Sequence, residues 1–159
     1  MSYPEPRYLA EQGAVSSVFR PADAEPDLHS RGGTRGGYLA TGASTQGQFG
    51  LYRWDMPAEP SGPSPHFHRS ITESFFIISG TVRLFNGEKW IDAKEGDFLY
   101  VPQGGVHGFR NESGVEASML ILFTPGAPRE EYFEELAAGR QFTPEEWSEF
   151  CLRHDTFWT

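Results

Sequence analysis

Two short segments, residues 65–73 and 102–107, constrain the fold more than any other part of the sequence. Together they hold three of the five histidines, and a glutamate ends the first of them. Successive side chains of an extended chain alternate between faces, so His66 and His68 point the same way, about 6–7 Å apart. Two imidazoles placed like this can converge on one ion. His107 has to arrive on a distant strand, so the fold must bring separated strands together to complete a site of three histidines and one carboxylate.

Strand-sized segments separated by turn signals fill most of the chain. The 18 glycines and 12 prolines are spread along it, which suits many short strands joined by turns. Asn86-Gly87 predicts a two-residue type I′ hairpin turn, because both of its positions need positive φ. The spacing of about 8–12 residues predicts a sandwich or barrel. The expected strands are residues 14–20, 37–42, 48–56, 73–80, 81–85, 88–92, 98–101, 107–111 and 116–124.

The two ends of the chain differ from this β pattern. Residues 1–14 are polar and contain proline, which predicts a loosely held arm that stays free or docks on a neighbouring subunit. Residues 128–138 predict a helix, with proline near its start and glycine past its end. A second helix is expected to open at Thr143 with a capping box. Its apolar stripe of Trp147, Phe150 and Cys151 would dock on the β-core.

Composition excludes several classes of protein. A length of 159 residues suits one domain, and the net charge of −9 argues against binding to nucleic acid or to an anionic membrane. No apolar run approaches the roughly 20 residues of a membrane span, and the N-terminus lacks the features of a signal peptide. Cys151 is the single cysteine, which excludes an internal disulfide and fits a reducing compartment. These features together predict a cytoplasmic protein.

The motifs resemble those of the cupin superfamily, and the chain is similar to its single-domain members. The second motif of that family is matched at Gly96, Pro102, Gly104, His107 and Asn111. The first is matched at His66, His68, Glu73 and Gly80. It departs only at its start, where the family carries an earlier glycine and here three residues separate Gly62 from His66. Two motifs in register make a far more specific signal than a lone His-x-His.

The resemblance implies an all-β fold, a cupin jelly-roll β-barrel with a C-terminal segment of two short helices. Residues 1–35 would form an arm and first strand, residues 36–125 the barrel, and residues 126–159 the helices packing on it. One divalent transition metal per chain is implied, held by His66, His68, Glu73 and His107. Such ligands suit Fe, Mn, Ni, Co, Cu or Zn and do not choose among them.

The chain further resembles quercetin dioxygenase-like cupins, a likeness that includes the run Phe123-Thr124-Pro125-Gly126 before an acidic, aromatic helix. In that group the glutamate ligand also acts as the base that deprotonates a bound enol or phenol, a role that the resemblance gives to Glu73. Strand parity places Phe75 and Ile77 on the face of Glu73, and Phe109 on that of His107. These three side chains would line an aromatic substrate pocket, or else fill the same space as core.

Three functions are compatible with these residues. The first is a metal-dependent oxygenase in which a small enolic or aromatic compound, flavonol- or polyketide-like, loses a proton to Glu73 and reacts with O2. The second is a non-oxidative isomerase, cyclase or lyase that uses the metal as a Lewis acid. The third is a small-molecule-binding cupin without catalysis. A homodimer is expected from the family, and an exposed edge strand gives it a physical motive. His29 and His154 lie outside the motifs and are expected to be solvated or packed.

Overall fold

Burial along the central strand shows which of its faces points into the fold. A computed structural model describes residues 2–159. In β5 (Thr72–Ser79), Phe75 and Ile77 are fully buried whereas Phe76 between them is 42% exposed. Alternation of this kind turns one face of a strand toward the core. The parity expected for Glu73, Phe75 and Ile77 is therefore confirmed, since all three point inward.

The larger of two facing sheets has six antiparallel strands. Their order is β1 (Leu28–His29), β2 (Arg35–Ala40), β3 (Gly50–Met56), β10 (Ala117–Thr124), β5 and β8 (Phe98–Val101). β10 pairs with β3 on one side and β5 on the other, so segments far apart in sequence are neighbours in the middle of the sheet. The side chains that fill the core between the sheets include Tyr52, Val82, Met119, Ile121 and Phe123.

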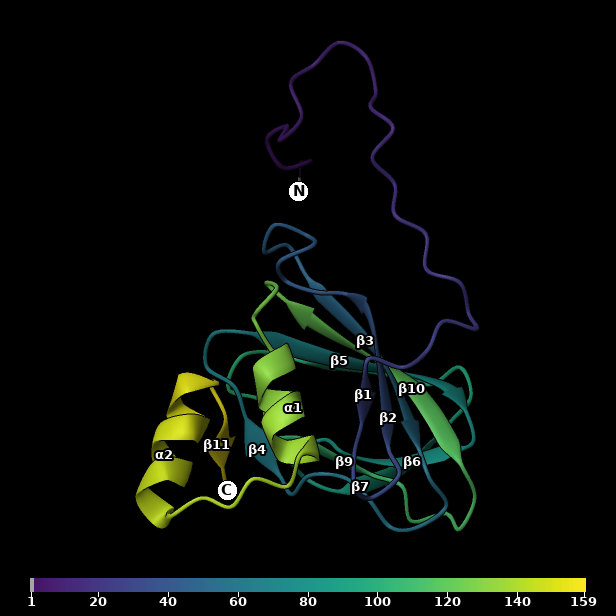
Figure 1. Cartoon of the computed structure of the whole chain (residues 1–159), viewed down its shortest axis with the longest axis vertical. Helices are drawn as coiled ribbons and strands as arrows, with labels where there is room; N and C mark the ends of the chain where they lie inside the picture. Colours follow the sequence, from purple (N-terminus) through teal and green to yellow (C-terminus); the bar gives the residue numbers. More distant parts are fainter. Residues whose placement is uncertain (1) are drawn as a thin grey trace.

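The second sheet carries the histidine segments. It contains β7 (Trp90–Lys94), β6 (Thr81–Phe85) and β9 (Gly108–Arg110). Residues 61–66 extend it beyond β9 through two bridges, one between Ser61 and Asn111 and one between His66 and His107. β4 (His66–Phe67) then pairs with β11 (Phe157–Trp158) at the C-terminal end. Two antiparallel sheets closed in this way form the jelly roll that was predicted (Figure 1).

Two helices follow the barrel, as predicted. Phe133 of α1 (Glu130–Ala137) packs on Tyr52, with ring centroids 5.3 Å apart. α2 (Pro144–Arg153) opens with the expected capping box between Thr143 and Glu146. The stripe of α2 packs on Tyr132 of α1 and on β11, rather than directly on the core of the barrel. Neither helix of residues 2–159 has the length and apolar character needed to cross a membrane.

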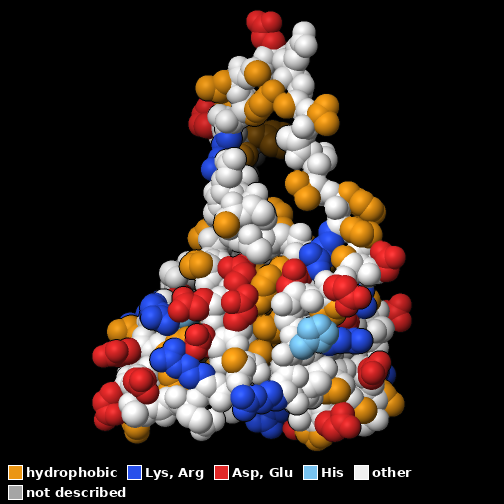
Figure 2. Space-filling view, viewed as in Figure 1, with side chains coloured by type: hydrophobic (Ala, Val, Ile, Leu, Met, Phe, Trp, Pro, Cys, Tyr) orange, Lys and Arg blue, Asp and Glu red, His pale blue; other side chains and the backbone are white. Residues whose placement is uncertain are grey.

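The expected strand at residues 14–20 is wrong. Residues 2–20 contain no strand and lead away from the barrel, with apolar side chains projecting into solvent (Figures 1 and 2). Val15, Val18 and Phe19 are almost entirely exposed. β propensity reflects packing on neighbouring strands, and this segment has no strand beside it. The first strand is instead β1, which lies between the first two expected strands and pairs with Arg35 and Gly36.

The hairpin at Asn86-Gly87 exists, but its turn is longer than predicted. Phe85 pairs with Trp90, so four residues connect β6 and β7. Only Gly87 of the dipeptide has positive φ, at 93°. The Asn86 Oδ1 accepts hydrogen bonds from the backbone N–H groups of residues 88 and 89, at 3.1 and 2.9 Å. This side-chain cap stabilises the wider loop in place of a type I′ turn.

Candidate metal centre

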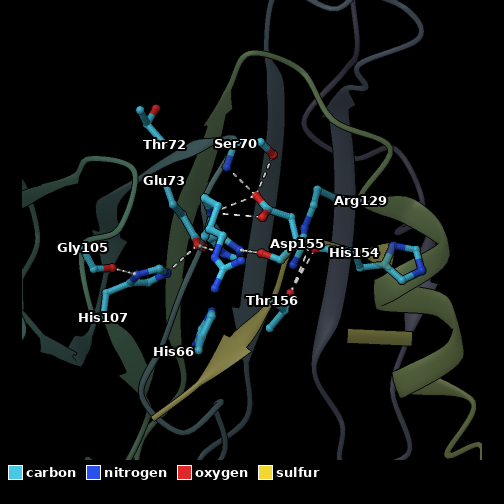
Figure 3. Close-up of polar contacts among 12 residues, drawn as sticks. His66, Ser70, Thr72, Glu73, Gly105, His107, Arg129, His154, Asp155 and Thr156 are labelled. Carbon is cyan, nitrogen blue, oxygen red and sulfur yellow. Dashed lines mark hydrogen bonds and ion pairs between the residues drawn. The ribbon is translucent and has the colours of Figure 1, made fainter. Parts of the chain in front are cut away.

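Four predicted ligands meet inside the barrel. Their candidate ligand atoms all lie within 4.8 Å of one another, and each side chain is buried. His66 and His107 sit opposite each other, because their backbone N–H and C=O groups exchange two hydrogen bonds of 2.8 Å. Their ring centroids are 4.5 Å apart. His68 reaches the same point from just after β4. Glu73 reaches it from β5 of the opposite sheet (Figure 3).

Backbone carbonyls set the protonation of the imidazole rings. The Nδ1 atoms of His66, His68 and His107 face the carbonyl oxygens of Ser64, Asp155 and Gly105, at 2.9, 2.5 and 2.9 Å. A carbonyl oxygen can only accept, so each Nδ1 carries the hydrogen and a neutral ring keeps its lone pair on Nε2. Metal-binding histidines are oriented by the same kind of contact in proteins.

The donor set fits a cation. The Glu73 Oε2 lies 3.1 Å from the His68 Nε2 and 2.7 Å from the His107 Nε2. Neutral rings of this tautomer and a carboxylate all present lone pairs, which repel one another in a buried site unless a proton or a metal ion lies between them. Three imidazoles and one carboxylate suit a divalent transition metal, so these residues could bind one.

Electrostatics at the site favour a negative charge on Glu73. Burial alone would raise the pKa of Glu73, but its contacts with His107 and His68 hold that pKa well below its usual range. Burial would lower the pKa of His107, and the carboxylate of Glu73 more than offsets it, so that pKa is raised. At His66 burial dominates and lowers the pKa to about 4. The carboxylate of Glu73 is thus anionic, and a cation bound between the ligands would be attracted to it.

An apolar cavity of about 380 Å³ opens beside the ligands. His66, Glu73 and Phe109 form part of its wall. Phe75 and Ile77 do not line it. Both are fully buried in the core, and the Phe75 ring packs behind those of His107 and Phe109, at centroid distances of 5.9 and 5.7 Å. Further aromatic side chains of the wall come from other elements, namely Trp54, Phe123, Tyr132, Phe133, Trp147 and Trp158.

The C-terminal segment supplies contacts that sequence reasoning missed. The Trp158 ring packs on His66 with centroids 5.1 Å apart. Asp155, with a positive φ of 50°, accepts hydrogen bonds from the segment that follows His68. Arg129 lines the cavity although it was not singled out from the sequence. No local motif marks these residues, because each acts through contacts with distant parts of the chain.

The remaining candidates have structural surroundings. His29 is exposed, and His154 is packed between Tyr132 and Phe150, so both match the expectation for histidines outside the motifs. The Asn111 amide donates to two backbone carbonyls at 2.7 Å, which ties the end of β9 to neighbouring loops. These residues support the barrel and lie outside the ligand cluster.

Comparison with known families agrees with the geometry. Residues 52–123 match the model of the cupin domain, and this stretch includes all four candidate ligands. Residues 52–123 form a cupin domain. The match runs from β3 to β10 and therefore covers the centre of both sheets.

Several known proteins resemble this chain. The quercetin 2,3-dioxygenase of Bacillus subtilis is 29% identical over 93 residues, which are 55% of this chain and 26% of the dioxygenase. The chain spans between 26% and 50% of the length of the curated relatives that it matches. A predicted oxalate decarboxylase from Thermotoga maritima superimposes with a TM-score of 0.60 at 19% identity, covering 67% of this chain and 97% of that one. An RmlC-like cupin from Shewanella frigidimarina gives 0.59 at 15% identity, covering 73% and 96%. These two structures support the fold.

Proposed function

We propose that this cupin is a metal-dependent oxygenase that acts on a small enolic or aromatic compound. The observation that carries the proposal is the position of the ligand cluster, which faces a cavity walled by aromatic side chains. The volume of about 380 Å³ is in the range of small-molecule sites. Four protein ligands also leave coordination positions open on a metal that prefers five or six.

His66, His68, Glu73 and His107 would hold the metal, and a bound metal would supply Lewis acidity and a place for a substrate oxygen. The Oε2 of Glu73 faces two histidines, whereas its Oε1 makes no hydrogen bond within residues 2–159. Oε1 is therefore available to accept the proton of a substrate hydroxyl. The resulting anion is the electron-rich form that reacts with O2. Aromatic walls exclude water from that anion and orient its ring.

The likeness to quercetin 2,3-dioxygenase supports the oxidative reading, although it covers about a quarter of that enzyme. Phe109 is proposed as a direct contact of the substrate ring, with Phe75 supporting it from behind. We also propose a homodimer in the cytoplasm. The edge strand β8 exposes Phe98 and Tyr100, which gives a second copy an apolar strand to cover.

The test combines metal analysis with oxygen uptake. The protein purified from its native host is expected to carry one transition metal per chain, and His107→Ala to lose most of it. Metal-loaded protein is then given flavonols and 1,3-diketones in an oxygen-electrode cell. Consumption of O2 in proportion to substrate supports the oxygenase, and Glu73→Gln is expected to abolish it.

Other results assign another function. Turnover of an enolic substrate under strict anaerobiosis would contradict the oxygenase proposal and favour the Lewis-acid isomerase, cyclase or lyase. Tight binding without any product would identify a binding protein. A His107→Ala protein with full metal content would contradict the ligand assignment itself.

A further inference from the structure

Arg129 is a buried cation without a carboxylate partner. It directly precedes α1 and is 3% exposed. None of the ion pairs formed among residues 2–159 includes it. A buried charge is normally paired, because moving it out of water is costly. An arginine in this state suggests that its anion comes from outside the chain.

The protein uses only one side of the guanidinium group. Nη1 donates to the backbone carbonyl of His154 at 2.6 Å and lies 3.4 Å from the Thr156 hydroxyl (Figure 3). Nε is enclosed and has no hydrogen-bond partner, and Nη2 makes no hydrogen bond to any residue from 2 to 159. Nε and Nη2 form the edge of arginine that binds a carboxylate through two parallel hydrogen bonds. That edge is unsatisfied.

The surroundings of Arg129 match an organic anion with a flat apolar body. Its guanidinium carbon lies 4.2 Å from the ring centroid of Tyr132, and 5.3 and 5.5 Å from those of Phe123 and Phe133. These rings hold the guanidinium plane but supply no negative charge. Burial lowers the pKa of Arg129, and the negative charge of Glu73 opposes this lowering most strongly. The Oε2 of Glu73 is nevertheless engaged with the histidines.

Arg129 and the ligand cluster share one cavity, since His66, Glu73 and Arg129 all line it. We propose that this cavity selects small aromatic carboxylates, with the carboxylate beside the unpaired Nη2 of Arg129 and the ring among the aromatic walls. The part of the inference that places the reacting end at the metal rests on the proposed function. The anion-binding role of Arg129 stands on its own contacts.

The test uses two probes that differ in charge and little in shape, 2-naphthoate and 2-naphthamide. Their binding is measured by isothermal titration calorimetry at pH 7, with metal-loaded protein and again after chelation. The unsubstituted protein is expected to prefer the carboxylate by about 10-fold or more in both states. Arg129→Gln is expected to weaken naphthoate binding by about 10- to 100-fold and to leave naphthamide binding unchanged. Arg129→Lys keeps the positive charge but lacks the planar guanidinium donors. Its affinity for naphthoate should lie between those of the unsubstituted and Arg129→Gln proteins.

Arg140→Gln is the matched control, because Arg140 also lies beside α1 but is exposed and pairs with Glu135. It is expected to change neither affinity. Equal losses for both probes in a folded Arg129→Gln protein would assign Arg129 a purely structural role and overturn the proposal. No preference for naphthoate in the unsubstituted protein would overturn it as well, and this measurement decides if neither variant folds.

Metal removal separates this inference from the proposed function. Naphthoate binding that is lost on chelation and insensitive to Arg129→Gln places the anion at the metal, which refutes the inference and leaves the oxygenase proposal standing. Naphthoate binding that depends on Arg129 in protein that never takes up metal supports the inference and refutes the oxygenase.

Discussion

Asp155 connects the C-terminal segment to the metal centre, and replacing it tests whether that segment orients a ligand. Its backbone carbonyl faces the Nδ1 of His68 at 2.5 Å. Its carboxylate accepts hydrogen bonds from the Arg69 N–H at 3.0 Å, the Ser70 N–H at 2.8 Å and the Ser70 hydroxyl at 2.6 Å. Asp155→Ala removes these three hydrogen bonds and places a Cβ-bearing residue without a local hydrogen bond at a φ of 50°.

The expected loss can be worked out from these contacts. Hydrogen bonds to a charged group contribute about 1.5–3 kcal/mol, but this carboxylate is partly exposed and water replaces some of the loss, so about 1 kcal/mol each is appropriate. The left-handed backbone adds about 1 kcal/mol for alanine. A total of about 3–4 kcal/mol corresponds to a fall in Tm of about 10 °C for a domain of this size. Because the backbone carbonyl of residue 155 that faces the His68 Nδ1 is then held less firmly, metal affinity is expected to fall about 10- to 100-fold.

Calorimetric unfolding measures the loss of stability, and competition with a chelator measures the loss of metal affinity. Asp155→Asn keeps one acceptor oxygen and tolerates positive φ, so it should lose about half as much stability. Asp155→Gly relieves the backbone cost and isolates the hydrogen bonds. A stability change below about 0.5 kcal/mol in Asp155→Ala would refute the reasoning, since surface substitutions without such contacts stay in that range. A large loss of stability with unchanged metal affinity would show that the tail does not orient His68.

Three further measurements test the metal site, the backbone and the buried histidine. Removing a metal present at 100 times its Kd is expected to cost about 2.7 kcal/mol and about 5–10 °C in Tm, measured with and without chelator. Gly62→Ala should cost more than about 3 kcal/mol, because its Cβ would lie 2.1 Å from the Phe109 carbonyl oxygen at a φ of 129°; Gly47→Ala, with positive φ and open space, should cost only about 1–2 kcal/mol. Burial lowers the pKa of His154, so the unfolded chain takes up a proton first and stability falls as the pH drops below about 6.5. His154→Phe should make this fall smaller in urea titrations at pH 5.5 and 7.5, because the contribution of His154 is then absent.

The core of the site was predictable because its geometry is local within each motif. Alternation along an extended strand was sufficient to place His66 and His68 on one face, and parity did the same for Glu73 and the core residues of β5. Only the meeting of the two motifs needed more than local reasoning, and the cupin resemblance supplied it. The bridge between His66 and His107 brings the two motifs together by pairing their backbone segments directly.

Predictions failed where a contact partner was decisive. Residues 14–20 have the composition of a strand, but an isolated strand leaves its backbone groups unpaired and gains no packing, so this segment stays exposed. The opposite error occurred at β1 and β11, which are two residues long and exist only because a neighbour accepts their hydrogen bonds. Neither could be read from a propensity pattern.

Strand parity also could not predict where the cavity lies, and this matters for function. Parity located the side chains facing the barrel interior, but it cannot tell filled space from open space, and Phe75 and Ile77 belong to the filled part. The open part is closed by α1, α2 and β11, elements outside the motifs. The barrel supplies the four ligands, and the C-terminal segment supplies Arg129 and Trp158. We therefore expect that related barrels with the same four ligands bind different small molecules when this segment differs. Exchange of residues 126–159 between such proteins should therefore transfer ligand preference while leaving the metal ligands in place.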